Sequence, residues 1–330
     1  MSATDTTPVT LPTAAPAVPP PAGRARRRGA KDPKQTTARH LRSNRTAYLM
    51  IAPMVILLAI FVIWPLGYAF YLSLFEISFY QDAKFVGLQF YTYVLTDPSF
   101  WHSLGVGLRY ALMVVPTILV LALLLASFIK TLSKRAAAIM KTTIYVPAVV
   151  SSVVTSVIFL FIYQDEGVAN WFVGLVHAGP IAWLNTDATA LPSIAVPGVW
   201  LGFGVSTLIM LAGILDIPES YYESALLDGA NFRQRTWYIT IPGLKNVLLY
   251  LLVTGFTLAL QEFQLPLIMT GGGPVDATNT PNLYIFNSFR DATPFATSYS
   301  LTASLLLFLV LGAISLVIFR AVSSQKSADS

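Results

Sequence analysis

The strongest constraint on the fold is a series of long windows without Asp, Glu, Lys or Arg. A helix needs about 20 apolar residues to cross a bilayer, and a charge at its centre costs roughly 2.5–3.5 kcal/mol on insertion scales. The windows cover 46–75, 110–129, 142–164, 188–215, 246–261 (resuming at 263) and 292–319. We therefore predict six transmembrane helices, at about 47–72, 109–130, 142–163, 194–215, 246–268 and 299–320.

The composition also indicates a membrane protein. Charged residues make up 11% of the 330 positions and apolar residues 55%, whereas a soluble domain carries roughly 25% charged residues. The alternative is that the six apolar segments are buried helices of a soluble protein. The chain has too few charged residues to cover the aqueous surface of such a protein. We predict an all-α polytopic membrane protein. The sequence has no cysteine and three widely separated histidines, so we expect no metal site.

Lys and Arg residues are distributed unevenly among the connections. Eighteen of the 21 lie on one side: nine before residue 46, four between the second and third helices, three between the fourth and fifth, and two after the sixth. Connections rich in Lys and Arg stay in the cytoplasm. We therefore expect both termini and the fourth–fifth connection to be cytoplasmic. The external connections, 73–108, 164–193 and 269–298, are acidic.

These helices divide the chain into three parts. Residues 1–45 are predicted to be a disordered cytoplasmic tail, rich in Pro and Ala and then in Arg. Residues 46–322 are predicted to form the six-helix domain, which includes the cytoplasmic connection 216–245, and 323–330 a short cytoplasmic tail. The basic cluster of the first tail is expected to fix the topology and to contact anionic membrane lipid, not nucleic acid.

Motifs for catalysis are missing from the sequence. It has no Gly-Lys pair, which excludes a phosphate-binding loop of the G-x-x-x-x-G-K type, and neither H-E-x-x-H nor G-x-S-x-G. The run 271–274 lacks the strand-then-helix context of a nucleotide loop, so we interpret it as a flexible break after the fifth helix. We expect no enzymatic activity and no cofactor on this chain.

The polar segment 219–242 interrupts the hydrophobic helices and needs a soluble partner. Asp216 and Pro218 are typical of a helix start, with Asp216 as the capping acid. The helix is predicted to break at 228–231 and to resume over 232–238. Small residues at this elbow would let a partner approach the backbone closely. An amphipathic helix lying on lipid is the alternative, which acids beside the aromatic residues disfavour.

The spacing of residues in this segment is specific. Glu223, Ser224 and Ala225 are followed after three residues by Gly229, and nine more lead to Ile239 and then to Ile241 and Pro242. This resembles the signature loop of binding-protein-dependent ABC importer permeases: E-A-A, three residues, G, nine residues, I-x-L-P. The resemblance implies a type I ABC importer permease fold with a cytoplasmic coupling helix that docks on a separate ATPase. The implied docking residues are Glu223, Ser224, Ala225, Asp228, Gly229, Ala230, Ile239 and Pro242.

Two further motifs narrow the resemblance. They are Phe85-Val86-Gly87-Leu88 followed by Tyr91, Asp97 and Phe100, and Thr270-Gly271-Gly272-Gly273-Pro274. With the Asp228-Gly229-Ala230 triplet, they are similar to motifs of carbohydrate-importer permeases of the maltose/glycerol-phosphate type. Of the two permease subunits in such importers, the chain resembles the first. Phe90 stands where that family often has Asn, and Ser298-Tyr299-Ser300 where it often has G-Y-A. The resemblance therefore does not assign the residues of the substrate site.

The resemblance implies a function and a set of partners. We expect the permease subunit of an ATP-driven importer in the bacterial plasma (inner) membrane, for a di- or oligosaccharide, with glycerol phosphate or another polar solute as the alternative. The implied partners are a second homologous permease (a heterodimer), two ATPase subunits that bind the ATP and Mg, and an extracytoplasmic solute-binding protein.

Polar residues in the fifth and sixth helices are candidates for the substrate path. Glu262 is the most conspicuous, because an ionisable group inside a span is costly and usually faces a cavity or partner. The alternative is an external-end Glu that hydrogen-bonds a neighbouring helix or water. The other candidates are Gln261, Gln264, Tyr299, Thr302 and Ser304, although hydroxyl residues also serve helix packing.

A stand-alone secondary transporter is the rival from another class. Such a protein would be expected to show paired discontinuous helices or inverted repeats, and it would leave the long cytoplasmic segment unexplained. A membrane-embedded enzyme is disfavoured because no acid, base and metal-ligand cluster occurs within the predicted spans.

Overall fold

The computed structural model describes residues 45–78, 82–176, 179–291 and 293–323. Except at Arg45 and Ser323, the two predicted cytoplasmic tails lie outside these residues. The chain divides into two compact units, one ending at Ile63 and the other beginning at Trp64.

The first unit is an apolar helix with outward-facing side chains. It consists of α2 (Arg45–Leu58) and the π-helical segment η1 (Ala59–Ile63). Leu49 is 77% exposed and Phe61 71%. Lipid tails accommodate such an apolar surface, whereas water does not. The helical stretch continues into α3 (Trp64–Leu72), and Tyr48–Leu72 is long and apolar enough to cross a membrane.

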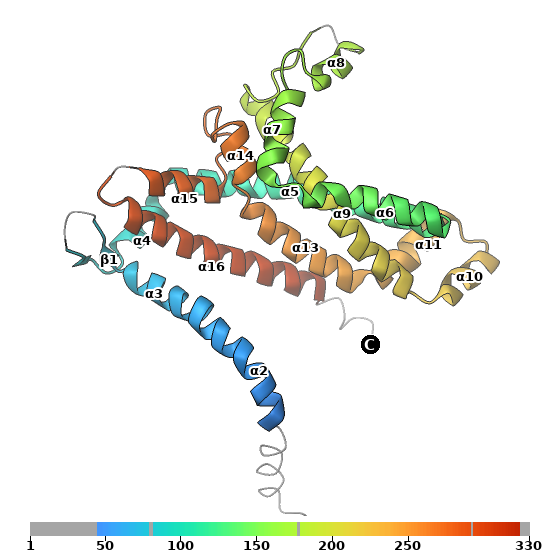
Figure 1. Ribbon diagram of the computed structural model, residues 1–330, viewed down its shortest axis with the longest axis horizontal. Helices are drawn as coiled ribbons and strands as arrows, with labels where there is room; N and C mark the ends of the chain where they lie inside the picture. The colour runs from blue at the N-terminus through green and yellow to red at the C-terminus, as the bar shows by residue number, and fades with distance from the viewer. Residues whose placement is uncertain (1–44, 79–81, 177–178, 292, 324–330) are drawn as a thin grey trace, which may run out of the picture. The chain divides into compact units, whose positions relative to one another are not determined.

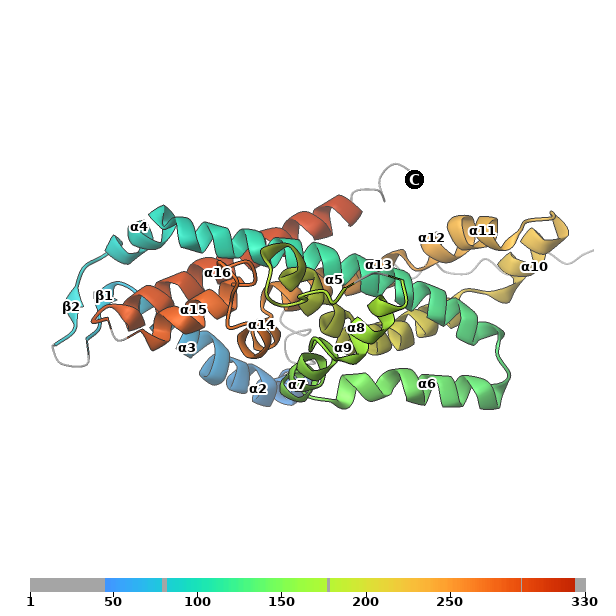
Figure 2. The same ribbon diagram turned by 90° about the horizontal axis from the view of Figure 1, so that it is seen from above.

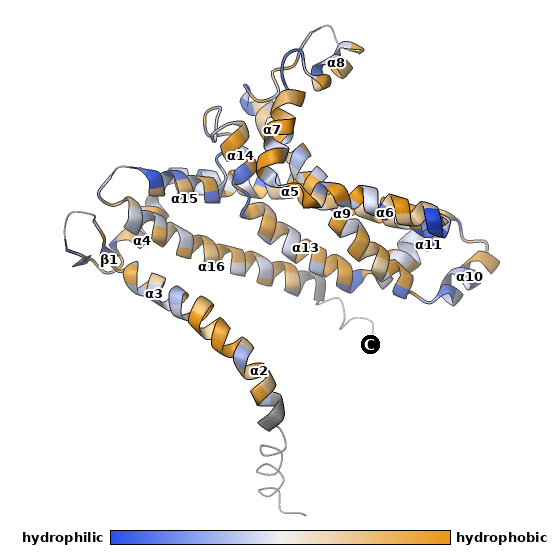
Figure 3. Cartoon of the chain, viewed as in Figure 1, coloured by the Kyte–Doolittle hydropathy of each residue, from blue (hydrophilic) through white to orange (hydrophobic). Residues whose placement is uncertain are grey.

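The second unit contains the other long apolar helices (Figures 1 and 3). Four stretches meet the length and composition of a membrane span among the described residues. They are α5 (Pro98–Thr131), α9 (Asp187–Asp216), α13 (Lys245–Leu260) with its continuation α14 (Gln264–Met269), and α16 (Ala296–Ser323). With the first stretch, these agree with five of the six predicted spans.

The third predicted span, 142–163, is wrong as a single helix. The segment belongs to α6 (Lys134–Val149) and α7 (Ser152–Ile162), which meet at a bend of 96°. Ser151 lies in the break, and its hydroxyl accepts a hydrogen bond from the Val154 N–H at 3.3 Å. This hydroxyl caps a new helix start. The sixth span exists only if the two bent helices are counted together.

Short elements connect the long helices. They are β1 (Phe75–Glu76), β2 (Lys84–Phe85), α4 (Gln89–Thr96), α8 (Val168–Gly174), α10 (Glu219–Leu227), α11 (Phe232–Arg235), the π-helical segment η2 (Thr236–Thr240), α12 (Ile241–Gly243) and α15 (Pro281–Arg290). The two strands pair antiparallel, Phe75 with Phe85 and Glu76 with Lys84. This small ladder was not predicted, and the other regular elements among the described residues are helices.

The core lies where α5 packs along α9 and α13. Tyr110, Ile194 and Leu260 are almost fully buried there. Small residues bring the backbones close: a Cβ at Gly204 would overlap the carbonyl oxygen of Ile144 in α6. Both views place α10 and α11 at one end of α5, and α4, β1 and α15 at the other (Figures 1 and 2). This packing holds the polar connection 216–245 at one end of the bundle.

Candidate functional site

The first half of the polar connection is the predicted helix, α10, but its start is different. Asp216 was predicted to cap it, and this is wrong. Asp216 is the last residue of α9, and Pro218 occupies the cap position of α10 without a side-chain hydrogen bond. Only Ile217 and Pro218 therefore separate α9 from α10.

The predicted break at Gly229 is confirmed. Gly229 has φ +76°, in the left-handed region that glycine adopts without a steric penalty. The Ala230 N–H donates to the Ala225 carbonyl at 2.8 Å, and the Gly229 N–H to the Leu226 carbonyl at 3.0 Å. These two bonds form a Schellman motif, which satisfies the last carbonyls of α10 and turns the chain back.

The second predicted helical piece is also present, as α11 followed by η2. Asn231 begins it with a capping box: its Oδ1 accepts from the Gln234 N–H at 2.9 Å, and Gln234 Oε1 accepts from the Asn231 N–H at 2.8 Å. Pro242 is the second residue of α12, which continues directly from η2. The segment 216–245 is thus a helix–turn–helix elbow.

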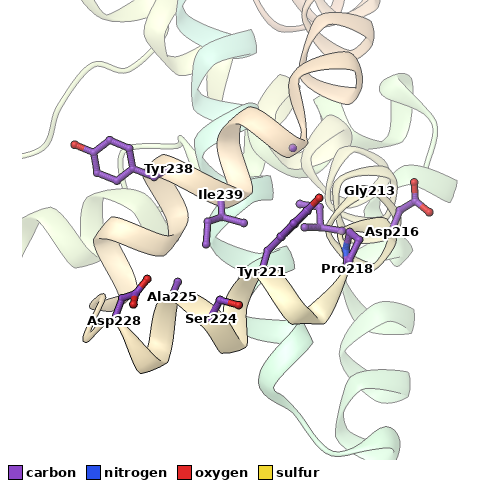
Figure 4. A pocket seen from close by; sticks show the side chains of 11 residues that line it. Gly213, Asp216, Pro218, Tyr221, Ser224, Ala225, Asp228, Tyr238 and Ile239 are labelled. Carbon is purple, nitrogen blue, oxygen red and sulfur yellow. The ribbon is translucent and has the colours of Figure 1, made fainter.

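A pocket of about 610 Å³ opens between the two halves of this elbow. Figure 4 shows Ser224 and Ala225 of α10, with Asp228 just after it, on one side and Ile239 of η2 on the other. Four of the eight predicted docking residues therefore line one concave surface. Glu223 and Pro242 are exposed outside it. Gly229 and Ala230 form the turn that closes the elbow.

Apolar side chains project from the elbow without cover from the described part of the chain. Leu227 is 89% exposed, Tyr238 75% and Trp237 68%. They lie beyond the candidate spans. Large apolar groups that surround a pocket are typical of a protein–protein contact.

Sequence reasoning missed two residues that hold the elbow. Tyr222 of α10 is buried, and its hydroxyl lies 3.1 Å from Thr240 Oγ1 in η2, so it joins the two halves. Lys130, in the last turn of α5, forms a salt bridge of 3.1 Å with Glu219 and lies 3.9 Å from the centre of the Tyr222 ring. Its position, 89 residues from Glu219, gave no local signal.

Glu262 lies in the break between α13 and α14, as a half-buried residue. Its Oε1 accepts from the Leu265 N–H at 3.0 Å at the start of α14, and its carbonyl accepts from Thr280 Oγ1 at 2.7 Å. Gln261 and Gln264 on either side are exposed. These bonds tie the break to the start of α14 and to Thr280.

The hydroxyl candidates of α16 do not act together. Thr302 is fully buried and donates to the Ser298 carbonyl of its own helix at 2.8 Å, which is a packing arrangement. Ser304 is exposed and lines a pocket of about 390 Å³ with Phe263, Asn282 and Phe286. Ser300 of the same pocket is 3% exposed, and its hydroxyl has no hydrogen-bond partner in the described part of the chain.

Tyr299 belongs to a cluster that joins three helices. Its hydroxyl donates to Asp97 Oδ2 at 2.6 Å, and the Tyr284 hydroxyl donates to the same oxygen at 2.5 Å. Asp97 Oδ1 accepts from the Ser99 N–H at 2.8 Å and caps α5. Burial opposes ionisation of the Asp97 carboxyl, but the bonds from Tyr284, Tyr299 and Ser99 outweigh it and lower its pKa below 3.8. Burial and the bond to Asp97 raise the pKa of Tyr284 to about 12.

The turn after α14 is a break, as predicted, but it is not a loose one. Gly271 and Gly272 both have positive φ. Thr278 is fully buried, donates to the Gly273 carbonyl at 2.8 Å and lies 2.7 Å from Thr270 Oγ1. Among the residues that the structure describes, no group of three or more His, Asp or Glu could hold a metal ion.

The fold and the elbow agree with a known family. Residues 110–327 match the family described as binding-protein-dependent transport system inner membrane component. The chain belongs to this family. It is therefore a multi-pass membrane permease subunit of the ABC importer class, as the resemblance of the signature loop implied.

Named relatives and solved structures give the same result. The chain is 32% identical to the trehalose/maltose transport system permease protein MalF of Thermococcus litoralis, over 78% of this chain and 88% of that one. A bacterial ABC transporter involved in the import of the acidic polysaccharide alginate has the same fold: TM-score 0.70, 20% identity, 89% of this chain and 99% of that one. A second alginate transporter structure, in complex with an alginate pentasaccharide-bound periplasmic protein, gives a TM-score of 0.69 at 19% identity, over 86% and 94% of the two chains. They confirm the ABC importer permease fold.

Proposed function

We propose that this permease imports a sugar, and that the elbow 216–245 is its cytoplasmic coupling loop. The observation that carries the proposal is the elbow itself: a concave surface built from Ser224, Ala225, Asp228 and Ile239, bordered by exposed apolar side chains. The chain has no nucleotide-binding motif. The free energy for transport would then enter through this surface, from a separate ATPase that carries the ATP and Mg.

The proposed orientation places both termini and the elbow in the cytoplasm, in a bacterial plasma membrane. The excess of Lys and Arg in the connections on one side supports it, because such connections are not translocated. The ends of α4 and α15 and the turn at Gly271 would then face outward, where a solute-binding protein can reach them. The alginate transporter solved with its sugar-loaded periplasmic protein has the same fold and supports this partner.

A second, homologous permease completes the proposed path. One chain of this size leaves broad apolar surfaces uncovered, such as that of Val149 and Phe161 along α6 and α7. An alternating path for a polar solute has to be enclosed by helices, since about 30 Å of hydrocarbon excludes it. Two ATPase subunits would then serve the two coupling loops of a heterodimer.

The proposed substrate is a di- or oligosaccharide. The names of the relatives support a sugar: trehalose or maltose for one and alginate for the other. Within this chain, Glu262, Gln261 and Gln264 lie at the break between α13 and α14. Ser304 lines a pocket with aromatic and amide side chains, which suits the apolar face and hydroxyl groups of a sugar ring. Tyr299 and Thr302 are already engaged, so we propose that they support the path without lining it.

Co-purification and ligand binding test this proposal. The chain, tagged and isolated from its own membranes, should bring with it a homologous permease and an ATPase. The cognate binding protein should bind a member of a panel of mono-, di- and trisaccharides. Binding of glycerol phosphates alone would redirect the substrate and keep the importer. Isolation of the chain as an active transporter without any ATPase would contradict the proposal.

A further inference from the structure

Lys130 connects the inner end of α5 to the start of the coupling loop. Its Nζ lies 3.1 Å from Glu219 Oε2 and 3.9 Å from the centre of the Tyr222 ring. Lys130 is in the last turn of α5, and Glu219 is in the first turn of α10. A cation is favoured at the carboxyl end of a helix and an anion at the amino end. The two helix dipoles therefore favour the same pairing as the two charges.

Tyr222 extends this contact to the second half of the elbow. Its side chain is 9% exposed, and its hydroxyl lies 3.1 Å from Thr240 Oγ1. A cation over an aromatic ring interacts more strongly when it is partly removed from water, and the Lys130 side chain is 22% exposed. Helix α5, helix α10 and segment η2 thus meet at one point.

This contact affects the position of α10 more than the stability of the fold. The Glu219 side chain is 65% exposed, and exposed ion pairs contribute little to stability. Helix α10 otherwise joins the bundle through its chain connections, Ile217 and Pro218 before it and the turn into α11 after it, and through the contact of Tyr222 with Thr240 in η2. None of these reaches α5, so the contact of Lys130 with Glu219 and Tyr222 ties the direction of α10 to that of α5.

Helix α5 reaches the opposite end of the bundle. It contains 34 residues, which correspond to about 50 Å at the rise of an α-helix. At its other end Asp97 caps it and accepts hydrogen bonds from Tyr284 of α15 and Tyr299 of α16. One continuous helix is therefore attached to the coupling loop at Lys130 and to the two last helices at Asp97.

We propose that Lys130 is the positioning residue through which a displacement of α10 moves α5, and with α5 the external ends of α15 and α16. The inference rests on the proposed docking of the elbow on an ATPase. It makes a distinct claim, because docking itself needs only the concave surface of the elbow and the apolar side chains around it. Loss of the Lys130 side chain should leave docking intact and uncouple the far end.

The absence of cysteine from the sequence allows a direct test. Ser99→Cys places a single thiol at the exposed start of α5, beside Asp97. The tagged full chain, isolated with its partner subunits and reconstituted in nanodiscs, is treated with a maleimide reagent, and modification of its band is followed. The labelling rate is measured without nucleotide and with ATP plus orthovanadate. A separate Ala225→Cys version, cross-linked to the ATPase, reports docking.

We expect nucleotide to change the Ser99→Cys labelling rate by about fivefold or more, the range of ordinary allosteric coupling. Lys130→Gln should abolish most of this change. Lys130→Arg, which keeps the charge and can stack on Tyr222, should retain it, as should Lys134→Gln, a control at the exposed start of α6. The Ala225→Cys cross-link should persist in Lys130→Gln.

Two results would overturn the inference. One is a nucleotide-dependent change in labelling rate in Lys130→Gln that equals the change in the parent protein. The other is a Ser99→Cys labelling rate that nucleotide does not change in the parent protein, while the Ala225→Cys cross-link forms. Failure of that cross-link in the parent protein would instead contradict the proposed docking. The two claims therefore fail separately.

Discussion

Replacing Asp97 by Asn should loosen the joint between α5, α15 and α16 while the cap of α5 remains. The carboxylate oxygen Oδ2 accepts two phenolic hydrogen bonds, at 2.5 and 2.6 Å. Hydrogen bonds to a charged group contribute about 1.5–3 kcal/mol each, and neutral ones about 0.5–1.5 kcal/mol. Because this site is only part-buried, we take the difference as about 1 kcal/mol per bond, and about 2 kcal/mol for the pair. Asn caps a helix as well as Asp does, so the bond from Ser99 should survive.

Hydrogen–deuterium exchange of the purified complex measures this effect. A loss of about 2 kcal/mol corresponds to about 30-fold more frequent local opening. The amides at the start of α5 and around Tyr284 should exchange faster by that factor, and those of α10 should not change. Asp97→Ala should destabilise this end by about 1 kcal/mol more than Asp97→Asn, because the cap is also lost. Tyr284→Phe should show about half of the destabilisation seen in Asp97→Asn. Exchange in Asp97→Asn equal to that of the parent protein would refute the reasoning.

The same carboxyl gives the joint a defined dependence on pH. Its pKa is lowered in the folded protein, so its contribution is complete above the ordinary value of 3.8 and is lost as the pH falls through the lowered pKa. Between pH 5 and 8 the exchange protection of this end should therefore not depend on Asp97 titration. Titration of the protection near neutral pH, absent in Asp97→Asn, would contradict the assignment.

The remaining predictions concern the coupling loop and the path. No atom lies within 4 Å of a Cβ placed at Gly229, so Gly229→Asp should fold and insert but stop uptake of the bound sugar, because the charge meets the partner. The control is Gly229→Asn, which also tolerates the left-handed region at a cost of about 1 kcal/mol and should keep most uptake. Normal uptake in the Asp variant would argue against docking there. Tyr222→Phe should speed amide exchange in η2 by about fivefold, from the loss of one hydrogen bond of about 1 kcal/mol; no change would remove Tyr222 as the link to Thr240. Glu262→Ala should change the apparent sugar affinity or the stimulation of ATPase activity, and if neither changes, the residue only caps α14.

Much of the architecture could be predicted because burial in lipid leaves a direct trace in sequence. Charge-free windows located five of the spans, since a charge in hydrocarbon is costly wherever it falls. The bend between α6 and α7 left no such trace, because Ser151 is uncharged and both arms are apolar. Charge counting cannot distinguish one helix from two that meet at a capped break.

The coupling loop was predictable for a different reason. Its turn depends on local chemistry, namely Gly229 in the left-handed region, so the break at 228–231 could be predicted from neighbouring residues. The cap at Asn231 was not predicted. Tyr299 was placed among the path candidates because it is polar and lies in a span, but its hydroxyl is bonded to Asp97, 202 residues away. Lys130 and Tyr222 were missed for the same reason. Contacts between distant segments depend on the packing of whole helices, which a single sequence does not report.

The central claim, that the elbow 216–245 receives a separate ATPase in the cytoplasm, is tested most directly by a cysteine at Ala225. In intact cells a membrane-impermeant maleimide should leave Ala225→Cys unlabelled. In isolated membranes a short bifunctional cross-linker should join it to the co-purifying ATPase subunit, and Ser99→Cys should form no such product. Labelling of Ala225→Cys from outside the cell, or the absence of any cross-link to an ATPase in an otherwise functional complex, would contradict the account.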